Sequence, residues 1–346
     1  MPYIRNGWYC IGFAHQLQDK PIAIRVLDEP IIIYRTSTGK PVALLDRCPH
    51  RFAPLSMGRV NGNDIECPYH GLRFGPDGGC TLNPHGTHVL PKSARVPAYT
   101  IVERDTLLWM WPGDQRQADA AVVPDFTSFF GLPDRGIVHG YFNLKAHYEL
   151  VLDNLMDLSH APFLHAGTLA EGPADTNVLR VETETRTDEV IARHLMDGVR
   201  PNPQFAPFWR APGAVGDFRA NMHWQAPGTL RLDVGICERG RPHDTGPNLH
   251  FGHLITPATS RETHYFWAAS RNFEVSNLQI SQLVQGSIQR AFVTEDEPMI
   301  EAVQSRMISE DIFAMNPVLL RGDEAGVLVR RALHRKRQAE RTSAEA

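Results

Sequence analysis

The sequence predicts an α+β protein in which an N-terminal all-β domain precedes a larger domain that combines helices with an antiparallel sheet. Two observations lead to this prediction. Up to about residue 112, short alternating or β-branched segments are separated by turn residues, which is typical of antiparallel strands. Beyond residue 124, strand-like segments are interspersed with helical ones. At 346 residues the chain is long enough for two such domains.

Four strands are expected in the N-terminal domain, because short runs there are rich in β-branched and aromatic residues. They cover residues 31–34, 41–45, 100–102 and 107–111. Residues 112–124 begin with Pro-Gly and are typical of a linker or a surface helix. We therefore expect the domain limit in this segment, with domains of 1–115 and 116–346.

The C-terminal domain is expected to contain strands and helices in irregular order. The strand-like segments are 229–236, 249–255 and 264–269, and the helical ones are 148–159, 278–304 and 323–337. Pro162 should end or kink the first helix, because its ring disfavours helical geometry at Ala161. His165 would then lie on the turn that follows.

Composition excludes several classes of function. Hydrophobic residues make up 42% of the chain and the formal net charge is -4. No basic stripe interleaved with aromatic residues is present, so no nucleic-acid partner is expected. The basic run at 330–341 is mixed with glutamates and predicts a solvated helix face. Neither a signal peptide nor an apolar run of membrane length is found, so we expect a soluble, cytoplasmic protein without a membrane partner.

Two of the five cysteines lie beside histidines in a pair of short loops. Cys48-Pro49-His50 is followed, after sixteen residues, by Cys67-Pro68-Tyr69-His70-Gly71. The proline after each cysteine removes a backbone donor and favours a stiff turn. The remaining cysteines, Cys10, Cys80 and Cys237, show no disulfide spacing and are expected to be buried free thiols.

The two loops can hold a metal centre. Two thiolates and two imidazoles fit either a tetrahedral zinc or a [2Fe-2S] cluster in which two histidines replace two cysteines on one iron. A zinc finger usually offers its cysteines together and then its histidines, whereas each loop here carries one of each. The spacing therefore favours the cluster, with Cys48, His50, Cys67 and His70 as ligands. Structural zinc is the alternative.

A second group of candidate metal ligands lies in the C-terminal domain. On a helix, Asp157 and His160 would share a face, and His165 would close on the same point from the next turn. Two imidazoles and a distant carboxylate from segment 292–304 would form the facial triad that leaves positions open for dioxygen on a ferrous ion. Taken alone, such a histidine pair is more often structural. A redox cluster in the same chain needs an electron acceptor, which favours the metal site.

The combined pattern resembles the Rieske non-haem iron oxygenases over nearly the whole chain. The loops match that family's Cys-x-His-x16-Cys-x2-His pattern, and residues 157–165 match its Asp-x2-His-x4-His segment. The similarity points to the branch that contains vanillate O-demethylase, dicamba O-demethylase and toluenesulfonate methyl-monooxygenase. Further matching segments are Asn6–Tyr9, Asp153–Met156, Ser270–Phe273 and Glu295-Asp296, with Pro207–Arg210 resembling the vanillate enzymes in particular.

The resemblance implies an N-terminal Rieske [2Fe-2S] domain and a C-terminal helix-grip catalytic domain with an antiparallel sheet. It makes His160, His165 and Asp296 the ligands of a mononuclear iron, with Asn154 close to the metal. Asp296 is preferred to Glu295 or Glu297 because it takes the second place of the family's Glu-Asp pair. The residues alone leave that choice open.

The resemblance also implies electron transfer between subunits of a head-to-tail homotrimer, because a heterologous ring can close at three. Asp157 matches an aspartate that, in the family, bonds an iron-bound histidine and the cluster histidine of the neighbouring subunit, which is His70 in this sequence. The alternative for Asp157 is an acid on a helix surface. Electrons from NAD(P)H would arrive through a separate flavin and iron-sulfur reductase, since no nucleotide-binding fingerprint is present.

The implied activity is a monooxygenase reaction on the methyl group of a small aromatic acid. O-demethylation of a methoxylated aromatic, with release of formaldehyde, is expected. Hydroxylation of an aryl methyl group or of the ring is the alternative. A Rieske-type electron carrier is the non-enzymatic alternative, which the long C-terminal domain disfavours, and a zinc-dependent hydrolase would use the same triad with water in the fourth position.

Two residues are candidates for substrate contacts. Arg231 shares a strand face with Asp233, and its guanidinium could clamp a carboxylate or sulfonate, or pair with Asp233 on the surface. His253 matches a pocket residue of the dicamba enzyme, although His250 is close enough in sequence to be mistaken for it. Trp224, Phe266 and Trp267 could form aromatic walls of the pocket or pack in the core, and the sequence leaves both alternatives open.

Overall fold

The chain forms two compact units in the computed structural model, which describes residues 3–130, 136–170, 179–211 and 213–345. The first unit comprises residues 1–125 with 256–259, and the second comprises 126–255 with 260–346. This division falls after Asp125, and the limit expected between residues 115 and 116 stays a prediction. In place of a surface helix, the segment before Asp125 has two short turns, η3 (Gln115–Gln117) and η4 (Ala120–Val122).

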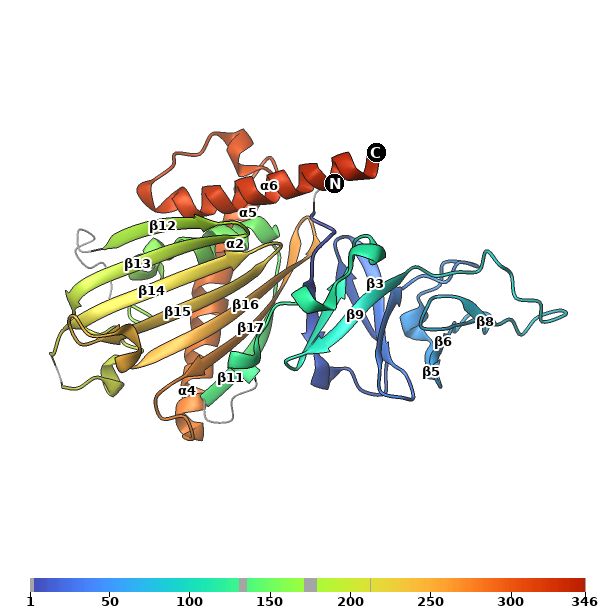
Figure 1. Ribbon diagram of the computed structural model, residues 1–346, viewed down its shortest axis with the longest axis horizontal. Coiled ribbons are helices and arrows are strands. Elements are labelled where there is room, and N and C mark those ends of the chain that lie inside the picture. The colour runs from blue at the N-terminus through green and yellow to red at the C-terminus, as the bar shows by residue number, and fades with distance from the viewer. Residues whose placement is uncertain (1–2, 131–135, 171–178, 212, 346) are drawn as a thin grey trace. The chain divides into compact units, whose positions relative to one another are not determined.

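The first unit is built from two antiparallel sheets (Figure 1). One has six strands in the order β1-β10-β9-β4-β3-β2, and the other has four in the order β5-β6-β7-β8. The strands are β1 (Tyr9–Phe13), β2 (Ile22–Val26), β3 (Glu29–Arg35), β4 (Pro41–Leu45), β5 (Arg59–Asn61), β6 (Asp64–Glu66), β7 (Arg73–Phe74), β8 (Cys80–Leu82), β9 (Ala98–Arg104) and β10 (Leu107–Trp111).

The four strands expected from the sequence are confirmed as parts of β3, β4, β9 and β10. Every residue of β10 is buried, and so are the central residues of β3, because β-branched and aromatic side chains fill the core on both faces. Cys48 and Cys67 belong to one buried cluster with Ile32, Tyr34 and Phe74. The core therefore holds both sulfur atoms in place, and Cys10 and Cys237 are buried free thiols as expected, whereas Cys80 is only half-buried.

The second unit contains a seven-stranded antiparallel sheet in the order β11-β17-β16-β15-β14-β13-β12 (Figure 1). Its strands are β11 (Gly136–Leu144), β12 (Arg180–Arg186), β13 (Glu189–Val199), β14 (Gly216–Gln225), β15 (Thr229–Cys237), β16 (Asn248–Thr259) and β17 (Glu262–Arg271). Its helices are α1 (Thr127–Phe130), α2 (Tyr148–Met156), α3 (Ala161–Leu164), α4 (Leu278–Ala291), α5 (Glu297–Arg306) and α6 (Glu324–Glu345). The three strands expected here lie within β15, β16 and β17, which confirms an antiparallel sheet combined with helices.

The helices differ in detail from those expected. The first ends at Met156, before Pro162, and Pro162 lies in the first turn of α3, where its missing N–H has no helical partner to lose. Ala161 is consequently helical, against expectation. The long helix expected at 278–304 is interrupted by a π-helical turn, η9 (Phe292–Asp296), and α6 extends well past the expected end at residue 337.

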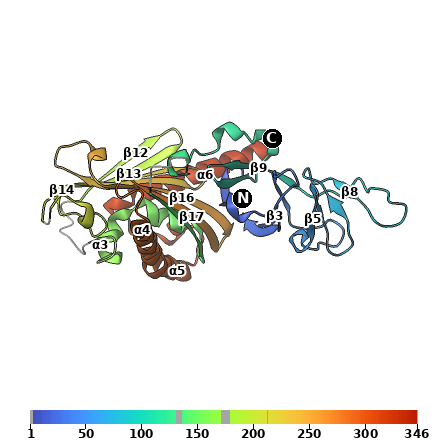
Figure 2. The ribbon, with the colours of Figure 1, turned by 90° about the horizontal axis from the view of Figure 1, so that it is seen from below.

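The two faces of this sheet are defined by its register. Val190, Trp224, Leu230 and His253 are direct partners across β13 to β16, so their side chains share what we call the helix face. The next row, Ile191, His223, Arg231 and Gly252, lies on the opposite face because side chains alternate. Phe292 of η9 stacks on Phe142 and meets Tyr265 edge-on, so the helices cover the helix face, and α3, α4 and α5 lie together on one side of the sheet (Figure 2).

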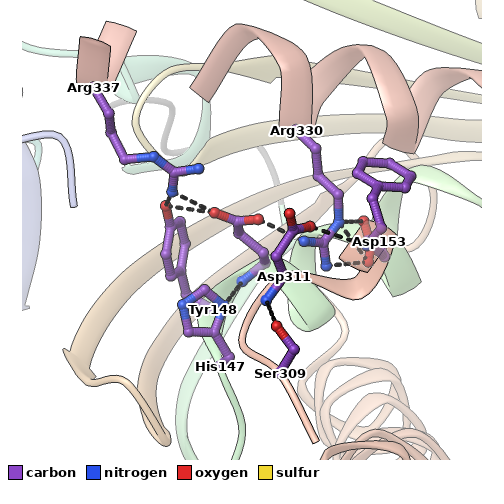
Figure 3. Close-up of polar contacts among 9 residues, drawn as sticks. His147, Tyr148, Asp153, Ser309, Asp311, Arg330 and Arg337 are labelled. Atoms are coloured by element: carbon purple, nitrogen blue, oxygen red, sulfur yellow. Dashed lines mark hydrogen bonds and ion pairs between the residues drawn. The ribbon is translucent and has the colours of Figure 1, made fainter. Parts of the chain in front are cut away.

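A buried ion-pair network fixes α2 to α6 (Figure 3). The guanidinium of Arg330 forms three hydrogen bonds with the carboxylate of Asp153, at 2.9, 3.0 and 2.6 Å, and a fourth with Glu149. Arg337, two turns further along α6, bonds both Glu149 and the hydroxyl of Tyr148. Because α2 has only nine residues, such tertiary contacts rather than helix propensity determine where it lies.

We expect Arg330→Met to lower the free energy of unfolding by about 3 kcal/mol or more, because it leaves the carboxylate of Asp153 without its cation and removes one of the two cations that pair with the buried Glu149. Lys336→Met is the matched control on the same helix: Lys336 pairs with Asp188 in solvent, where the loss is below about 1 kcal/mol. Urea unfolding monitored by tryptophan fluorescence measures both. Equal losses for the two variants would contradict the structural role of the network.

The same network makes stability depend on pH. Burial raises the pKa of Glu149, but the charges of Arg330 and Arg337 outweigh burial and hold the pKa below its usual value. The ionised carboxylate therefore stabilises the protein fully above the usual glutamate pKa of about 4.3, and the effect is lost as pH falls through the lower native value. The difference in unfolding free energy between wild type and Glu149→Gln should be largest at pH 7 and shrink below pH 4, as urea titrations at each pH would measure.

Candidate metal centres

The two Cys-His loops of the first unit adopt the same backbone turn. In each loop the cysteine N–H donates to the carbonyl five residues later, and its own carbonyl accepts from the N–H four residues later. That fourth residue has a left-handed φ in both loops, 60° at Phe52 and 70° at Gly71. Glycine adopts this conformation without steric cost, which gives Gly71 a physical role in the second loop.

The four donor residues are arranged as a cluster site requires. The thiols of Cys48 and Cys67 are buried and adjacent, whereas the rings of His50 and His70 lie toward the surface with centroids 4.4 Å apart. Burial raises the pKa of Cys48 to about 11, the N–H groups of His50 and Arg51 oppose this, and the Cys67 thiol adds to it. Two buried sulfurs and two outward imidazoles fit a cluster with one Cys-ligated and one His-ligated iron.

The helix face of the second unit carries the other donor group. The ligand atoms of His160, His165 and Asp296 lie within 4.8 Å of one another, which holds for no other group of three such residues in the described part of the chain. The two Nε2 atoms are 3.3 Å apart, and they lie 3.5 and 3.3 Å from the two carboxylate oxygens of Asp296.

Local structure brings these three residues together. His160 ends the turn η5 (Leu158–His160), and His165 caps α3, so a short reversal after α2 places both imidazoles on one side. Asp296 is the last residue of η9, whose wider π-helical turn separates α4 from α5. Turns of this kind are frequent at functional sites.

In His160 and His165, a hydrogen bond at Nδ1, the outer nitrogen, leaves Nε2, the inner nitrogen, able to bind a metal. Nδ1 of His165 lies 2.6 Å from Oε2 of Glu295, and Nδ1 of His160 lies 2.7 Å from the backbone carbonyl of Asp157. Both partners accept only, so each Nδ1 carries the proton and each Nε2 presents its lone pair to the other ring. The arrangement therefore fits a bound cation between the two histidines and Asp296.

Further contacts stabilise the carboxylates. Asn154 donates to Oδ1 of Asp296 at 3.1 Å, and the hydroxyl of Thr168 donates to Glu295 at 2.9 Å. Burial lowers the pKa of His160. It would also lower the pKa of His165, but the carboxylates of Asp296 and Glu295 outweigh it and raise that pKa. The three donor residues carry a net negative charge from Asp296, and solvent has little access to them. Both properties favour binding of a divalent cation.

Asp157 has more than one role in this arrangement. Its backbone carbonyl, rather than its carboxylate, contacts His160, while the carboxylate accepts from the N–H of Ser159 at 2.9 Å. His194 lies 3.8 Å from the same carboxylate, at ion-pair rather than hydrogen-bond distance. Burial raises the pKa of Asp157, but His194 and Ser159 reverse the shift and bring it to about 2. The side chain is 26% exposed and stays ionised at neutral pH.

The two candidate substrate residues do not share a face. His253 lies on the helix face, and its direct partner on β15 is Leu230, so Arg231 points to the opposite face. Arg231 lines a cleft of about 230 Å³ there with His223 and Asp233. Asp233 pairs with Arg219 through two bonds of 2.8 Å. The anion clamp and the Arg231–Asp233 ion pair both stay predictions.

The aromatic candidates divide in the same way. Tyr265 and Trp267 lie on the helix face with Phe142, whereas Phe266, one residue between them, points to the other side. Trp224 is on the helix face and is almost fully buried. Trp224 and Trp267 are therefore available to the helix face, and Phe266 is not.

The structure adds residues that the sequence did not single out. They are Thr168, His194, Tyr265 and, as the outer partner of His165, Glu295. Only Glu295 had a sequence signal, its place beside Asp296. The others depend on strand register or on loop geometry that periodicity does not record.

Comparisons with known proteins identify two family domains in this chain. Residues 7–99 match the model of the Rieske [2Fe-2S] domain, and residues 144–339 match the vanillate O-demethylase oxygenase C-terminal domain. The chain belongs to the Rieske oxygenase family. Its matched domains are a Rieske domain followed by the oxygenase domain of the vanillate O-demethylase branch.

Individual relatives cover almost the whole chain. The dicamba O-demethylase oxygenase component of Stenotrophomonas maltophilia is 34% identical over 98% of this chain and 99% of its own. The chloroacetanilide N-alkylformylase oxygenase component of Rhizorhabdus wittichii is 34% identical over 98% and 97%. The crystal structure of dicamba monooxygenase bound to dicamba superposes with a TM-score of 0.90 at 34% identity, covering 98% of this chain and 99% of that one.

This Rieske oxygenase is thus the oxygenase component of a monooxygenase system, not a lone electron carrier or a zinc hydrolase. Its cofactors are a Rieske [2Fe-2S] cluster and a mononuclear non-haem iron, and a reductase supplies the electrons in these systems. Within the described residues, no helix is both long and apolar enough to cross a membrane.

We expect Glu295→Ala to weaken iron binding at the His160–His165–Asp296 site by about 10- to 100-fold, because it removes the acceptor that orients His165. Glu295→Gln, which keeps an acceptor oxygen, should fall between this variant and wild type. Glu297→Ala is the matched control, two residues away in α5. Anaerobic titration with ferrous ion measures the three affinities, and an unchanged affinity in Glu295→Ala would contradict the orienting role.

Proposed function

We propose that this protein is the terminal oxygenase that hydroxylates the methyl group of a small methoxylated aromatic acid, releasing formaldehyde. One observation carries the proposal: a group of two imidazoles and one carboxylate, with inner nitrogens free for a metal, in a chain similar to the dicamba enzyme over its whole length. Hydroxylation converts the methyl ether to a hemiacetal, which collapses to a phenol and formaldehyde. Dioxygen, NAD(P)H and a proton are consumed, and water and NAD(P)+ are the other products.

In this proposal Cys48, His50, Cys67 and His70 hold the [2Fe-2S] cluster, and His160, His165 and Asp296 hold the iron. The chemistry supplied by these groups, when bound, is one-electron transfer and the activation of dioxygen. The remaining residues position the donors. Asn154 keeps one oxygen of Asp296 in place, and Glu295 and the carbonyl of Asp157 keep both rings in the tautomer that can bind a metal.

The substrate would occupy the helix face beside this group. His253 is the polar candidate there, and the acid expected from the sequence would meet it rather than Arg231, which points away. The names of the relatives favour dealkylation at oxygen or nitrogen. Hydroxylation of an aryl methyl group, for which the same atoms would serve, is the second candidate.

A head-to-tail homotrimer is the second part of the proposal. Asp157 is partly exposed, lies directly after α2 and contacts His160 through its carbonyl, so its carboxylate can meet a group from a neighbouring chain. His70 lies toward the surface in the first unit and is the residue that would meet it. Light scattering on the purified protein should give three chains or a multiple of three, and any other number would count against this route.

The overall activity has a direct assay. The protein with a related reductase, NADH and dioxygen is supplied with vanillate, 3-methoxybenzoate and 4-methylbenzenesulfonate, and formaldehyde and hydroxylated products are quantified. Formaldehyde in equal amount to phenol from a methoxylated acid supports O-demethylation. An alcohol from the sulfonate supports methyl hydroxylation instead, and near three irons and two acid-labile sulfides per chain confirm loading of both sites.

Asp157→Asn should reduce turnover by about 100-fold or more while the iron and sulfide contents stay at wild-type values, because the residue would connect the two centres rather than hold either. Asp188→Asn, on the solvent-exposed pair with Lys336, is the matched control and should retain full turnover. Stopped-flow measurement of cluster oxidation during single turnover separates electron transfer from substrate binding. Loss of either metal in Asp157→Asn would overturn the assignment.

A further inference from the structure

A buried histidine-tyrosine pair lies on the helix face. His253 is 6% exposed and Tyr265 is 3% exposed, and Nδ1 of the histidine is 2.6 Å from the tyrosine hydroxyl. His253 also lies parallel to the ring of Phe251, at 3° and 5.7 Å. Packing on both residues leaves little freedom to move, so the hydrogen bond between them is a fixed feature of the fold.

The pair adjoins the donor group of the second unit. Tyr265 meets the ring of Phe292 edge-on at 4.7 Å, and Phe292 begins the same π-helical turn that ends at Asp296. Burial lowers the pKa of His253 to about 3, and the carboxylate of Asp296 is close enough to oppose that shift. His253 is therefore a neutral imidazole at physiological pH.

Counting hydrogen bonds decides which nitrogen of His253 carries the proton. Within the described residues, the bond to His253 is the one hydrogen bond of the Tyr265 hydroxyl, and Nε2 of His253 has no partner. If Nδ1 donated to the hydroxyl, the tyrosine proton and the Nε2 lone pair would both be buried without partners. If the hydroxyl donates to Nδ1, only the Nε2–H group lacks one, and buried polar groups are rarely left unpaired.

Two other side chains of the helix face also have a buried N–H group that lacks a hydrogen-bond acceptor. Trp224 and Trp267 are buried, and within the described part of the chain their indole N–H groups have no acceptor. An indole nitrogen can only donate. Together with Nε2–H of His253, the face offers donors in excess and no side-chain cation at this row of the sheet, since Arg231 lies on the other side.

We propose that Tyr265 is a positioning residue that fixes His253 as an N–H donor, so that the helix face selects substrates by a hydrogen-bond-accepting oxygen. This rests on the proposed function in taking the helix face as the substrate site. The accepting oxygen belongs either to the carboxylate or to the methoxy group of the aromatic acid. A substrate that offers only a donor at this point leaves the N–H unpaired and is rejected.

The tautomer is tested on the protein without any substrate. Solid-state nitrogen NMR of full-length protein, labelled at histidine, with the cluster oxidised and the iron site empty, is compared with His253→Gln to identify the His253 signals. We expect a protonated Nε2 and an unprotonated Nδ1 in wild type, and a mixture of both tautomers in Tyr265→Phe. A protonated Nδ1 in wild type, or an unchanged pattern in Tyr265→Phe, would overturn the proposal whether or not the enzyme demethylates anything.

Substrate selection is tested by calorimetry with vanillate and with 2-methoxyphenol, which lacks the carboxylate. Tyr265→Phe should weaken vanillate binding and raise its KM by about five- to tenfold, with kcat changed much less, since one net hydrogen bond is worth about this factor. A loss for vanillate alone assigns the acceptor to the carboxylate, and an equal loss for both assigns it to the methoxy oxygen. Unchanged affinity for both overturns the selection role.

Tyr141→Phe is the matched control for this test. Tyr141 also bonds a histidine, His264, with 2.8 Å between its hydroxyl and Nδ1, but this pair is 41% exposed at the tyrosine and lies on the face opposite Tyr265. Loss of a tyrosine hydroxyl from such a pair should leave vanillate affinity and KM at wild-type values. An effect of Tyr141→Phe equal to that of Tyr265→Phe would mean that the sheet is perturbed in general and would contradict the assignment.

Discussion

The guanidinium of Arg330 is the contact on which the geometry of the second unit depends. It joins the C-terminal helix to α2 through Glu149 and Asp153, residues far away in sequence. Helix α2 is short, and the two histidines follow directly from its end. The N–H of His147, just before α2, is held by Gln304 of α5 at 2.7 Å. Other helices therefore hold the segment that carries the metal donors. Buried charged groups fix its position with more directional precision than apolar contacts would.

Three histidines of the same unit acquire different chemistry from the partner at Nδ1. A carboxylate faces His165 and a backbone carbonyl faces His160, so both present a lone pair at Nε2. A hydroxyl faces His253, and its proton makes Nε2 a donor instead. A protonated nitrogen cannot bind a metal, which explains how a third imidazole can lie near Asp296 without joining the donor group. In the proposed function, one residue type thus supplies both metal ligands and a substrate contact, and the hydrogen bond at Nδ1 decides which role each histidine takes.

Sequence reasoning reached the parts of the molecule that short-range patterns encode. Strands such as β4 and β10, and the spacing of Cys48, His50, Cys67 and His70, are local features with few alternatives. The face of the sheet on which Arg231 lies could not be assigned from the sequence, because it depends on the register between β15 and β16, a contact between segments that the sequence does not pair. The place of Asp296 rather than Glu295 beside both Nε2 atoms depends on the π-helical turn, which has no periodicity of its own. The role of α6 was missed because its arginines are charged residues that pattern analysis assigns to solvent.

The π-helical turn at Phe292–Asp296 has a consequence for how this site tolerates change in chain length. A π turn holds one residue more than an α turn, and each residue of an α-helix rotates the side chains by about 100°. Glu295 and Asp296 reach the two nitrogens of one ring, His165, from adjacent positions because the turn is widened there. Removing one residue would restore a regular helix and could even favour its formation, yet it would rotate one carboxylate away from the ring. Homologous chains should therefore gain or lose residues freely in surface loops but keep the number of residues between Phe292 and Pro298 constant.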